Sequence, residues 1–216
     1  MQDFDFSQVH HYKFYGFIKN SLGWVIKVVY RIRLKGVENV PSEDSRYIVA
    51  INHTCALDPV FAAYSRKVPP MHFMAKAELY EKPAVAWIIT HMYGFPVMRG
   101  KGDNTSIAYG QKIVEEGHVM ALCPEGRRVK DKGGVPQEPR PGVAIIAHNA
   151  HADVLPAAIC CDGPIRPFKK VTVVYGKLLT NAELGLDKEE VSREEISAAA
   201  QMVMDRITEL WESERK

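Results

Sequence analysis

The chain has 216 residues, of which 46% are hydrophobic and 25% are charged, and its formal net charge is +2. These values predict one compact α/β domain with a sizeable core, and they exclude disordered and fibrous proteins. The four cysteines have no metal-ligand spacing, and an adjacent pair such as Cys160 and Cys161 is untypical of a disulfide framework, so we expect a reducing cytosolic environment.

The first part of the chain is basic and rich in aromatic residues. Residues 1–35 contain six basic and two acidic side chains, whereas residues 181–216 contain five basic and ten acidic ones. Basic residues interrupt the apolar runs well before the ~20 residues of a membrane span, and we expect no secretory signal. We therefore expect an N-terminal amphipathic helical segment over residues 1–30 that lies on a membrane surface, followed by one domain over residues 31–216. A helix that packs its apolar side on the core is the ordinary alternative.

Hydrophobic periodicity and turn-forming residues predict alternating helices and strands. In chain order we expect a helix over 6–28, strands over 30–34 and 47–52, a helix over 59–66, a strand over 71–75, a helix over 83–93 and a strand over 95–98. There follow a helix that ends at Gly117, a strand over 118–123, a loop over 129–139, a helix over 142–149, strands over 154–160 and 170–175, and a last helix. Ser192 and Glu195 form a capping box that begins this last helix. The order predicts an α/β fold with a mixed, largely parallel central sheet flanked by helices on both faces.

The stretch around His53 and Asp58 is the most informative part of the sequence. On a regular helix, side chains five positions apart point about 140° away from each other, so the pair meets only if the chain bends. Pro59 predicts that bend, with Asp58 as the N-cap of a helix and His53 on the preceding loop, free to fold back toward the carboxylate. Such a pair is typical of a general base with its orienting acid. A helix cap beside an unrelated polar histidine is equally compatible with these residues.

Charged side chains directly follow three of the predicted strands. They are His53 with Asp58, then Arg99, and then Glu125 with Arg127 and Arg128. In parallel α/β sheets, ligands bind at the carboxyl ends of the strands. We therefore expect the three clusters to converge on one site.

Other kinds of site find less support. The glycines near lysine match neither the nucleotide-phosphate loop nor the dinucleotide fingerprint. His148, His151 and Asp153 lack the ligand pattern of a metal site, and basic and aromatic residues do not alternate as they do in nucleic-acid binders.

A thiol mechanism is the weaker catalytic alternative. Cys55 or Cys123 would be the nucleophile and His53 the base, as in a cysteine hydrolase. Cys123 ends an apolar strand, a position more typical of a small buried hydrophobic residue.

Taken together in chain order, the motifs resemble the glycerophospholipid acyltransferase family, in particular lysophosphatidic acid acyltransferases. Four blocks match over roughly residues 31–180: Asn52-His53-x4-Asp58, Gly94 to Arg99, Pro124-Glu125-Gly126 with Arg128, and Val154 to Ala157. The ordered set is far more specific than any single block. The chain departs from the family where Arg127 replaces the usual threonine and Val129 the usual serine.

The resemblance implies general-base catalysis by an acyltransferase domain over residues 31–216. His53 would take the proton of an acceptor hydroxyl as the oxygen attacks an acyl thioester, and Asp58 would orient the imidazole. The residues implied to bind a substrate phosphate are Arg99, Arg128 and Arg140, and those implied to bind the acceptor or to shape the site are Asn52, Glu125, Gly126 and Arg127. No metal and no permanently bound cofactor are implied.

The implied reaction moves a fatty acyl group from acyl-CoA or acyl-carrier-protein to the free hydroxyl of a lysophospholipid. The expected acceptor is 1-acylglycerol 3-phosphate, which gives phosphatidic acid in phospholipid synthesis. Arg166, Lys169 and Lys170 are candidates to receive an acidic carrier protein or the phosphates of coenzyme A, or they form an ordinary solvated loop. We expect peripheral attachment to anionic lipids at the cytoplasmic face of the membrane. The alternatives are a catalytically silent lipid-binding protein and an acyltransferase for an amine or another lysolipid.

Overall fold

The computed structural model describes residues 4–12, 15–42, 46–64, 69–98, 104–128 and 135–215, with the backbone alone for residues 17–20 and 22. Its α-helices are α1 (Tyr15–Tyr30), α2 (Asp58–Ala62), α3 (Pro83–His91), α4 (Asn104–Glu115), α5 (Gly142–Asn149) and α6 (Arg193–Ser213). Its 3-10 helices are η1 (Val37–Asn39) and η2 (Ala77–Glu81). Its strands are β1 (Arg33–Lys35), β2 (Tyr47–Ile51), β3 (Met71–Lys76), β4 (Gly94–Val97), β5 (Val119–Leu122), β6 (Asp153–Cys160) and β7 (Thr172–Tyr175).

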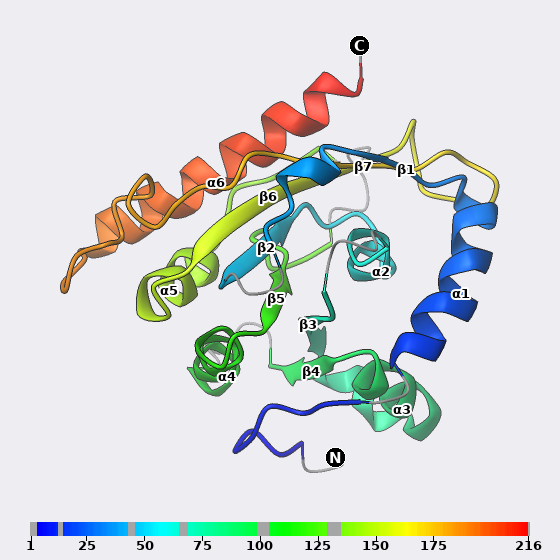
Figure 1. Ribbon diagram of the computed structural model, residues 1–216, viewed down its shortest axis with the longest axis horizontal. Coiled ribbons are helices and arrows are strands. Elements are labelled where there is room, and N and C mark those ends of the chain that lie inside the picture. The colour runs from blue at the N-terminus through cyan, green and yellow to red at the C-terminus, as the bar shows by residue number, and fades with distance from the viewer. Residues whose placement is uncertain are drawn as a thin grey trace.

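The strands form one seven-stranded sheet in the order β1-β7-β6-β2-β5-β3-β4 (Figure 1). Neighbouring strands are parallel except β6 and β7, which are antiparallel. The central strand β2 pairs with β5 on one side and with β6 on the other, so that Val49 lies between Ala121 and Leu155. The mixed, largely parallel sheet predicted from the sequence is confirmed.

Helices cover both faces of the sheet, as the sequence predicts. In Figure 1, α4, α5 and α6 lie on one side and α1 and α2 on the other. All five residues of β2 are buried, because alternate side chains enter opposite cores. Ile48 and Ala50 pack in the core under α4, α5 and α6, whereas Val49 and Ile51 pack in the core under α1 and α2.

The N-terminal segment differs from the helix predicted over residues 6–28. The helix α1 begins at Tyr15, and residues 4–12 form a non-helical stretch along the protein surface. Asp5 accepts a hydrogen bond from the backbone N–H of Ser7 at 2.8 Å, and such a turn competes with helix formation. Phe4 packs edge-on against Tyr109 of α4. Within the described residues, no helix is both long and apolar enough to cross a bilayer.

Candidate active site

His53 and Asp58 are in direct contact. The Nδ1 atom of His53 lies 2.8 Å from Oδ2 of Asp58, and both residues are buried. Because the carboxylate accepts this hydrogen bond, Nδ1 carries the proton and Nε2 is the basic nitrogen of the neutral ring. The five-residue spacing is bridged by an irregular loop between β2 and α2, as the sequence predicts.

Asp58 does not cap α2, contrary to the prediction from the sequence. Leu57 occupies the N-cap position and Asp58 is the first helical residue. Its carboxylate instead turns back over the preceding loop. Five donors serve its two oxygens: the backbone N–H groups of Thr54 and Cys55, the Thr54 hydroxyl, the Cys55 thiol and the His53 ring. This cage fixes the position of the carboxylate.

Asn52 ties the loop that carries His53 to the neighbouring strand. Its side-chain NH2 donates to the carbonyl of Ile159 at 3.0 Å, and its Oδ1 accepts from the Ile159 N–H at 2.7 Å. The amide thereby substitutes for a peptide group and continues the pairing of β2 with β6 beyond the last backbone pair. Asn52 is fully buried, so it shapes the site by holding the backbone next to His53 in place.

Glu125 supports the same loop from the end of β5. Its Oε2 accepts from the backbone N–H of His53 at 2.5 Å, and its Oε1 accepts from the backbone N–H of Gln137 at 2.9 Å. Burial raises the pKa of Glu125 to about 7, against the opposing effect of these two hydrogen bonds. Glu125 was expected to bind the acceptor or to shape the site. Its two oxygens join the His53 loop to the stretch of chain around Gln137, which is compatible with a site-shaping role.

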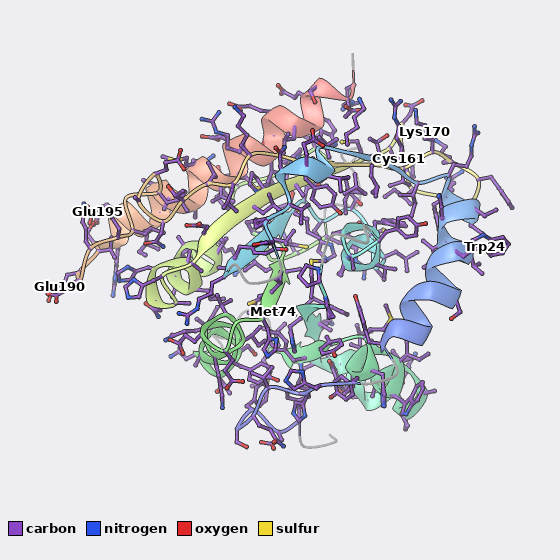
Figure 2. All side chains as sticks on the ribbon, in the orientation of Figure 1. Trp24, Met74, Cys161, Lys170, Glu190 and Glu195 are labelled. Atoms are coloured by element: carbon purple, nitrogen blue, oxygen red, sulfur yellow. The ribbon has the colours of Figure 1, made fainter. Side chains whose placement is uncertain are left out.

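A cavity of about 500 Å³ opens beside His53. One part of its wall carries His53 and the guanidinium-bearing side chains Arg127 and Arg140. The rest is mainly apolar and comes from β3, β4, β5 and the inner sides of α4 and α5, with these residues: Met74, Val97, Met98, Ile107, Leu122, Val143, Ile145 and Ile146. In Figure 2, Met74 lies near the middle of the molecule, between α4 and the sheet. The cavity therefore joins a base, two cations and a hydrocarbon-like wall.

Gly126 makes room for Arg140. The glycine has φ of +66°, and a Cβ at this position would lie 2.6 Å from Cδ of Arg140. The backbone N–H of Arg140 also donates to the carbonyl of Pro124 at 2.8 Å. The stem of Arg140 thus lies directly over the turn that follows β5, which places its charged end at the cavity.

The structure separates the predicted cationic residues. All three arginines are exposed, but Arg127 and Arg140 line the cavity and Arg128 does not. Arg99 lies outside the described residues, so its predicted contact with a phosphate stays a prediction. Among the residues described, Arg127 and Arg140 form no ion pair with a carboxylate.

Three parts of the site were not predicted from the sequence. Gln137 belongs to the loop predicted over residues 129–139, and its backbone N–H donates a hydrogen bond to Glu125. The apolar wall from α4 and α5 was not predicted, because helical periodicity indicates a buried face without showing whether a neighbour fills it. Asn104 also lines the cavity, and its position at the start of α4 was the only signal for it.

The alternative sites fit the structure less well. The Cys55 thiol donates to Oδ1 of Asp58 at 3.3 Å, and burial followed by the nearby carboxylate raises the pKa of Cys55 to about 12. A thiol that is protonated in this way is a poor nucleophile. In the described part of the chain no group of histidine, cysteine and acidic residues is arranged to hold a metal ion. His148 instead pairs through Nδ1 with the carbonyl of Leu186 at 2.9 Å.

Comparison with known proteins gives consistent results. The family model described as acyltransferase matches residues 31–161. The 1-acyl-sn-glycerol-3-phosphate acyltransferase of Bacillus subtilis is 27% identical over 201 residues, which cover 91% of this chain and 96% of that protein. The enzyme of the same name from Streptococcus pneumoniae is 26% identical over 129 residues, which cover 59% of this chain and 46% of that protein.

A solved structure shares the fold. The crystal structure of the 1-acyl-sn-glycerophosphate acyltransferase from Thermotoga maritima superposes with a TM-score of 0.66, covers 93% of this chain and 82% of its own, and is 20% identical in sequence. The family model spans more than half of the chain and contains His53, Asp58 and Glu125. The chain therefore belongs to the acyltransferase family of enzymes.

Proposed function

We propose that this protein transfers a fatty acyl group from an acyl thioester to the free hydroxyl of 1-acylglycerol 3-phosphate and so forms phosphatidic acid. The observation that carries the proposal is the His53–Asp58 pair, joined at 2.8 Å on the wall of a cavity with both cationic and apolar surfaces. The names of the relatives from Bacillus subtilis and Streptococcus pneumoniae support the choice of acceptor.

His53 acts as the general base in this proposal. Its Nε2 takes the proton of the acceptor hydroxyl while the oxygen attacks the thioester carbonyl, a contribution of about 10²- to 10⁴-fold for a placed base. The imidazolium that forms is stabilised by Asp58. The tetrahedral intermediate then expels the thiolate, which receives the same proton from His53. The products are an ester and a free thiol, and no acyl-enzyme is required.

The two kinds of wall suit the two ends of a lysophospholipid. Arg127 and Arg140 hold the phosphate by charge-assisted hydrogen bonds. Arg140 is thus kept from the predicted set of Arg99, Arg128 and Arg140, and Arg127 takes the place of Arg128. The helix α5 begins at the same cavity, and within the described residues no side chain caps its N-terminus, so its first N–H groups also favour an anion. The apolar wall receives hydrocarbon.

The acyl chains also determine where the enzyme works. Burying a methylene group is worth about 0.8 kcal/mol, so moving a ~16-carbon chain into water costs on the order of 10 kcal/mol. We propose that the enzyme binds the cytoplasmic membrane surface through its N-terminal segment, residues 1–30, and acts there on acyl-CoA or acyl-carrier-protein. The exposed side chains of Trp24, Val25 and Val28 on α1 support this placement.

The test is thioester consumption with lysophosphatidate, compared between the wild type and His53→Ala. We expect turnover by the wild type and at least a 10²-fold loss in the variant. Equal turnover would remove His53 as the base. Wild-type protein that consumes no thioester with lysophosphatidate, other lysolipids or amines would favour a silent lipid-binding protein.

A further inference from the structure

The segment between β6 and β7 contains a tight turn with an unusual residue in it. The backbone N–H of Lys169 donates to the carbonyl of Arg166 at 3.2 Å, which closes a four-residue turn with Pro167 and Phe168 at its centre. Phe168 has φ of +67°. Proline followed by a residue with positive φ is the signature of a type II turn, in which the second central position is normally glycine or asparagine. A bulky aromatic residue is strained at this position.

Nothing in the core requires this phenylalanine. Its side chain is 75% exposed, the highest value among the exposed large hydrophobic residues of the described chain. A strained and exposed apolar residue contributes little to the stability of the fold, and strain of this kind persists where it serves another purpose.

The turn is held firmly against the end of α1. The backbone N–H of Phe168 donates to the carbonyl of Val29 at 2.6 Å, and the N–H of Val171 donates to the carbonyl of Tyr30 at 3.0 Å. Figure 1 shows this segment, in yellow, beside the C-terminal end of α1. The ring of Phe168 is therefore presented at a fixed place, next to the exposed surface of that helix.

The surroundings of Phe168 combine apolar and basic side chains. Trp24 and Val28, one turn apart on α1, are 67% and 54% exposed. Exposed basic residues accompany them on both elements: Lys27 and Arg31 at the end of α1, and Arg166 and Lys170 in the turn. Figure 2 shows Trp24 and Lys170 on the same outer edge of the molecule. Aromatic side chains among cations match the interface of an anionic bilayer, in which rings enter the headgroup region and cations contact lipid phosphates.

We propose that Phe168 is a membrane anchor, which inserts into the interface of a bilayer containing anionic lipid and acts with Trp24 and Val28 of α1. The inference goes beyond the proposed function, because it assigns a membrane contact to a turn about 140 residues away in the sequence from the N-terminal segment. Contacts from both α1 and this turn fix the orientation of the enzyme on the membrane, whereas a contact through α1 alone would let the enzyme rotate about the axis of that helix. Arg166 and Lys170 then serve the lipid surface and not an acidic carrier protein.

The conformation of the turn provides a sharp test. Phe168→Gly removes the ring and places the preferred residue at the strained position, so the variant should melt at the same or a higher temperature. Its binding to vesicles of phosphatidylglycerol and phosphatidylcholine, measured by co-sedimentation, should weaken by about tenfold, which corresponds to about 1.4 kcal/mol. Met202→Ser, which removes an exposed apolar side chain of α6, is the matched control and should bind as the wild type does.

Two further measurements separate the outcomes. Arg166→Glu with Lys170→Glu should weaken binding to anionic vesicles and leave the low affinity for pure phosphatidylcholine unchanged. Turnover of detergent-dispersed substrate by Phe168→Gly should equal that of the wild type, so a loss of vesicle binding is distinguishable from a failure of the proposed reaction. Unchanged vesicle binding by Phe168→Gly would overturn the proposal. So would a variant whose only defect is a higher KM for an acyl-carrier-protein donor, which would assign the turn to a protein partner.

Discussion

Glu125, at the end of β5, accepts a hydrogen bond from the backbone N–H of His53 at 2.5 Å, across 72 residues of sequence. The second carboxylate oxygen accepts from the N–H of Gln137. Asp58 orients the imidazole ring, while Glu125 holds the backbone that carries it. The imidazole of His53 is thus held by two acidic residues, one at its side chain and one at its main chain.

Replacing Glu125 by glutamine should therefore affect both stability and turnover. The amide has one acceptor oxygen for two backbone donors, so one buried N–H loses its partner. We expect the free energy of unfolding to fall by about 1–3 kcal/mol and kcat to fall with it. Denaturant titration and steady-state kinetics measure the two effects. Glu138→Gln, an exposed carboxylate of the same stretch, should change stability by less than about 0.5 kcal/mol.

The pKa of Glu125 predicts a pH dependence of stability. Burial raises this pKa to about 7 from its ordinary value of 4.5, so between these values the folded protein binds a proton that the unfolded chain has released. The contribution of this protonation to the free energy of unfolding is complete below about pH 4.5 and is lost as the pH rises through about 7. Over this range the free energy of unfolding falls by at most about 1.4 kcal/mol per pH unit. Unfolding free energies measured from pH 4.5 to 8 should show this decline. In Glu125→Gln the decline should be absent, and an identical slope in both proteins would contradict the assignment.

Asp58→Asn should reduce kcat by about 10²- to 10⁴-fold with little change in the KM for the acceptor. The amide cannot accept all the hydrogen bonds of the cage, and it no longer stabilises the imidazolium. Initial rates over a range of acceptor concentrations separate the two parameters. A variant with a raised KM and a normal kcat would show that Asp58 binds substrate instead.

Gly126→Ala should displace Arg140. The added Cβ meets the Cδ of Arg140 at 2.6 Å, so we expect a higher acceptor KM and a loss of about 1–3 kcal/mol in stability. Gly117→Ala is the matched control, because Gly117 also has positive φ, at +86°, but open space around it. That control should cost only the backbone strain of about 1 kcal/mol and leave KM unchanged.

Arg127 and Arg128 are neighbours in sequence with different positions relative to the cavity. Arg127→Thr should raise the KM for lysophosphatidate by about tenfold or more, because a charge-assisted contact with the phosphate is lost. Arg128→Thr should stay within about twofold of the wild type, since Arg128 is not part of the cavity wall. A larger increase in KM for Arg128→Thr than for Arg127→Thr would assign phosphate binding to Arg128.

The sequence was most informative where local pattern determines structure. The range of α5 and the capping box of Ser192 and Glu195 were predicted correctly, because their signals are apolar runs with clear boundaries and short-range hydrogen bonds. The central strand β2 ended one residue before the predicted limit. The start of α1 was placed too early, because aromatic residues of the first segment pack on α4 and not on one helical face.

The site was predictable only in part, for a physical reason. The pairing of His53 with Asp58 spans five positions of sequence and was one of two alternatives that the sequence left open. The clamp of Asn52 on Ile159 and the bond of Glu125 to the His53 backbone join residues 107 and 72 positions apart. Such contacts follow from the order of strands in the sheet, and a single sequence contains no local signal for that order.

The amide clamp of Asn52 has a consequence for how such an enzyme changes its substrates. The His53–Asp58 pair is anchored to the central strands of the sheet, whereas much of the cavity wall belongs to α4, α5 and the turn after β5. In the proposed reaction, mutations in those outer elements would alter the fit of headgroup and hydrocarbon while the His53–Asp58 pair keeps its alignment. New acceptors are therefore accessible by small steps, each starting from a chemically competent catalyst.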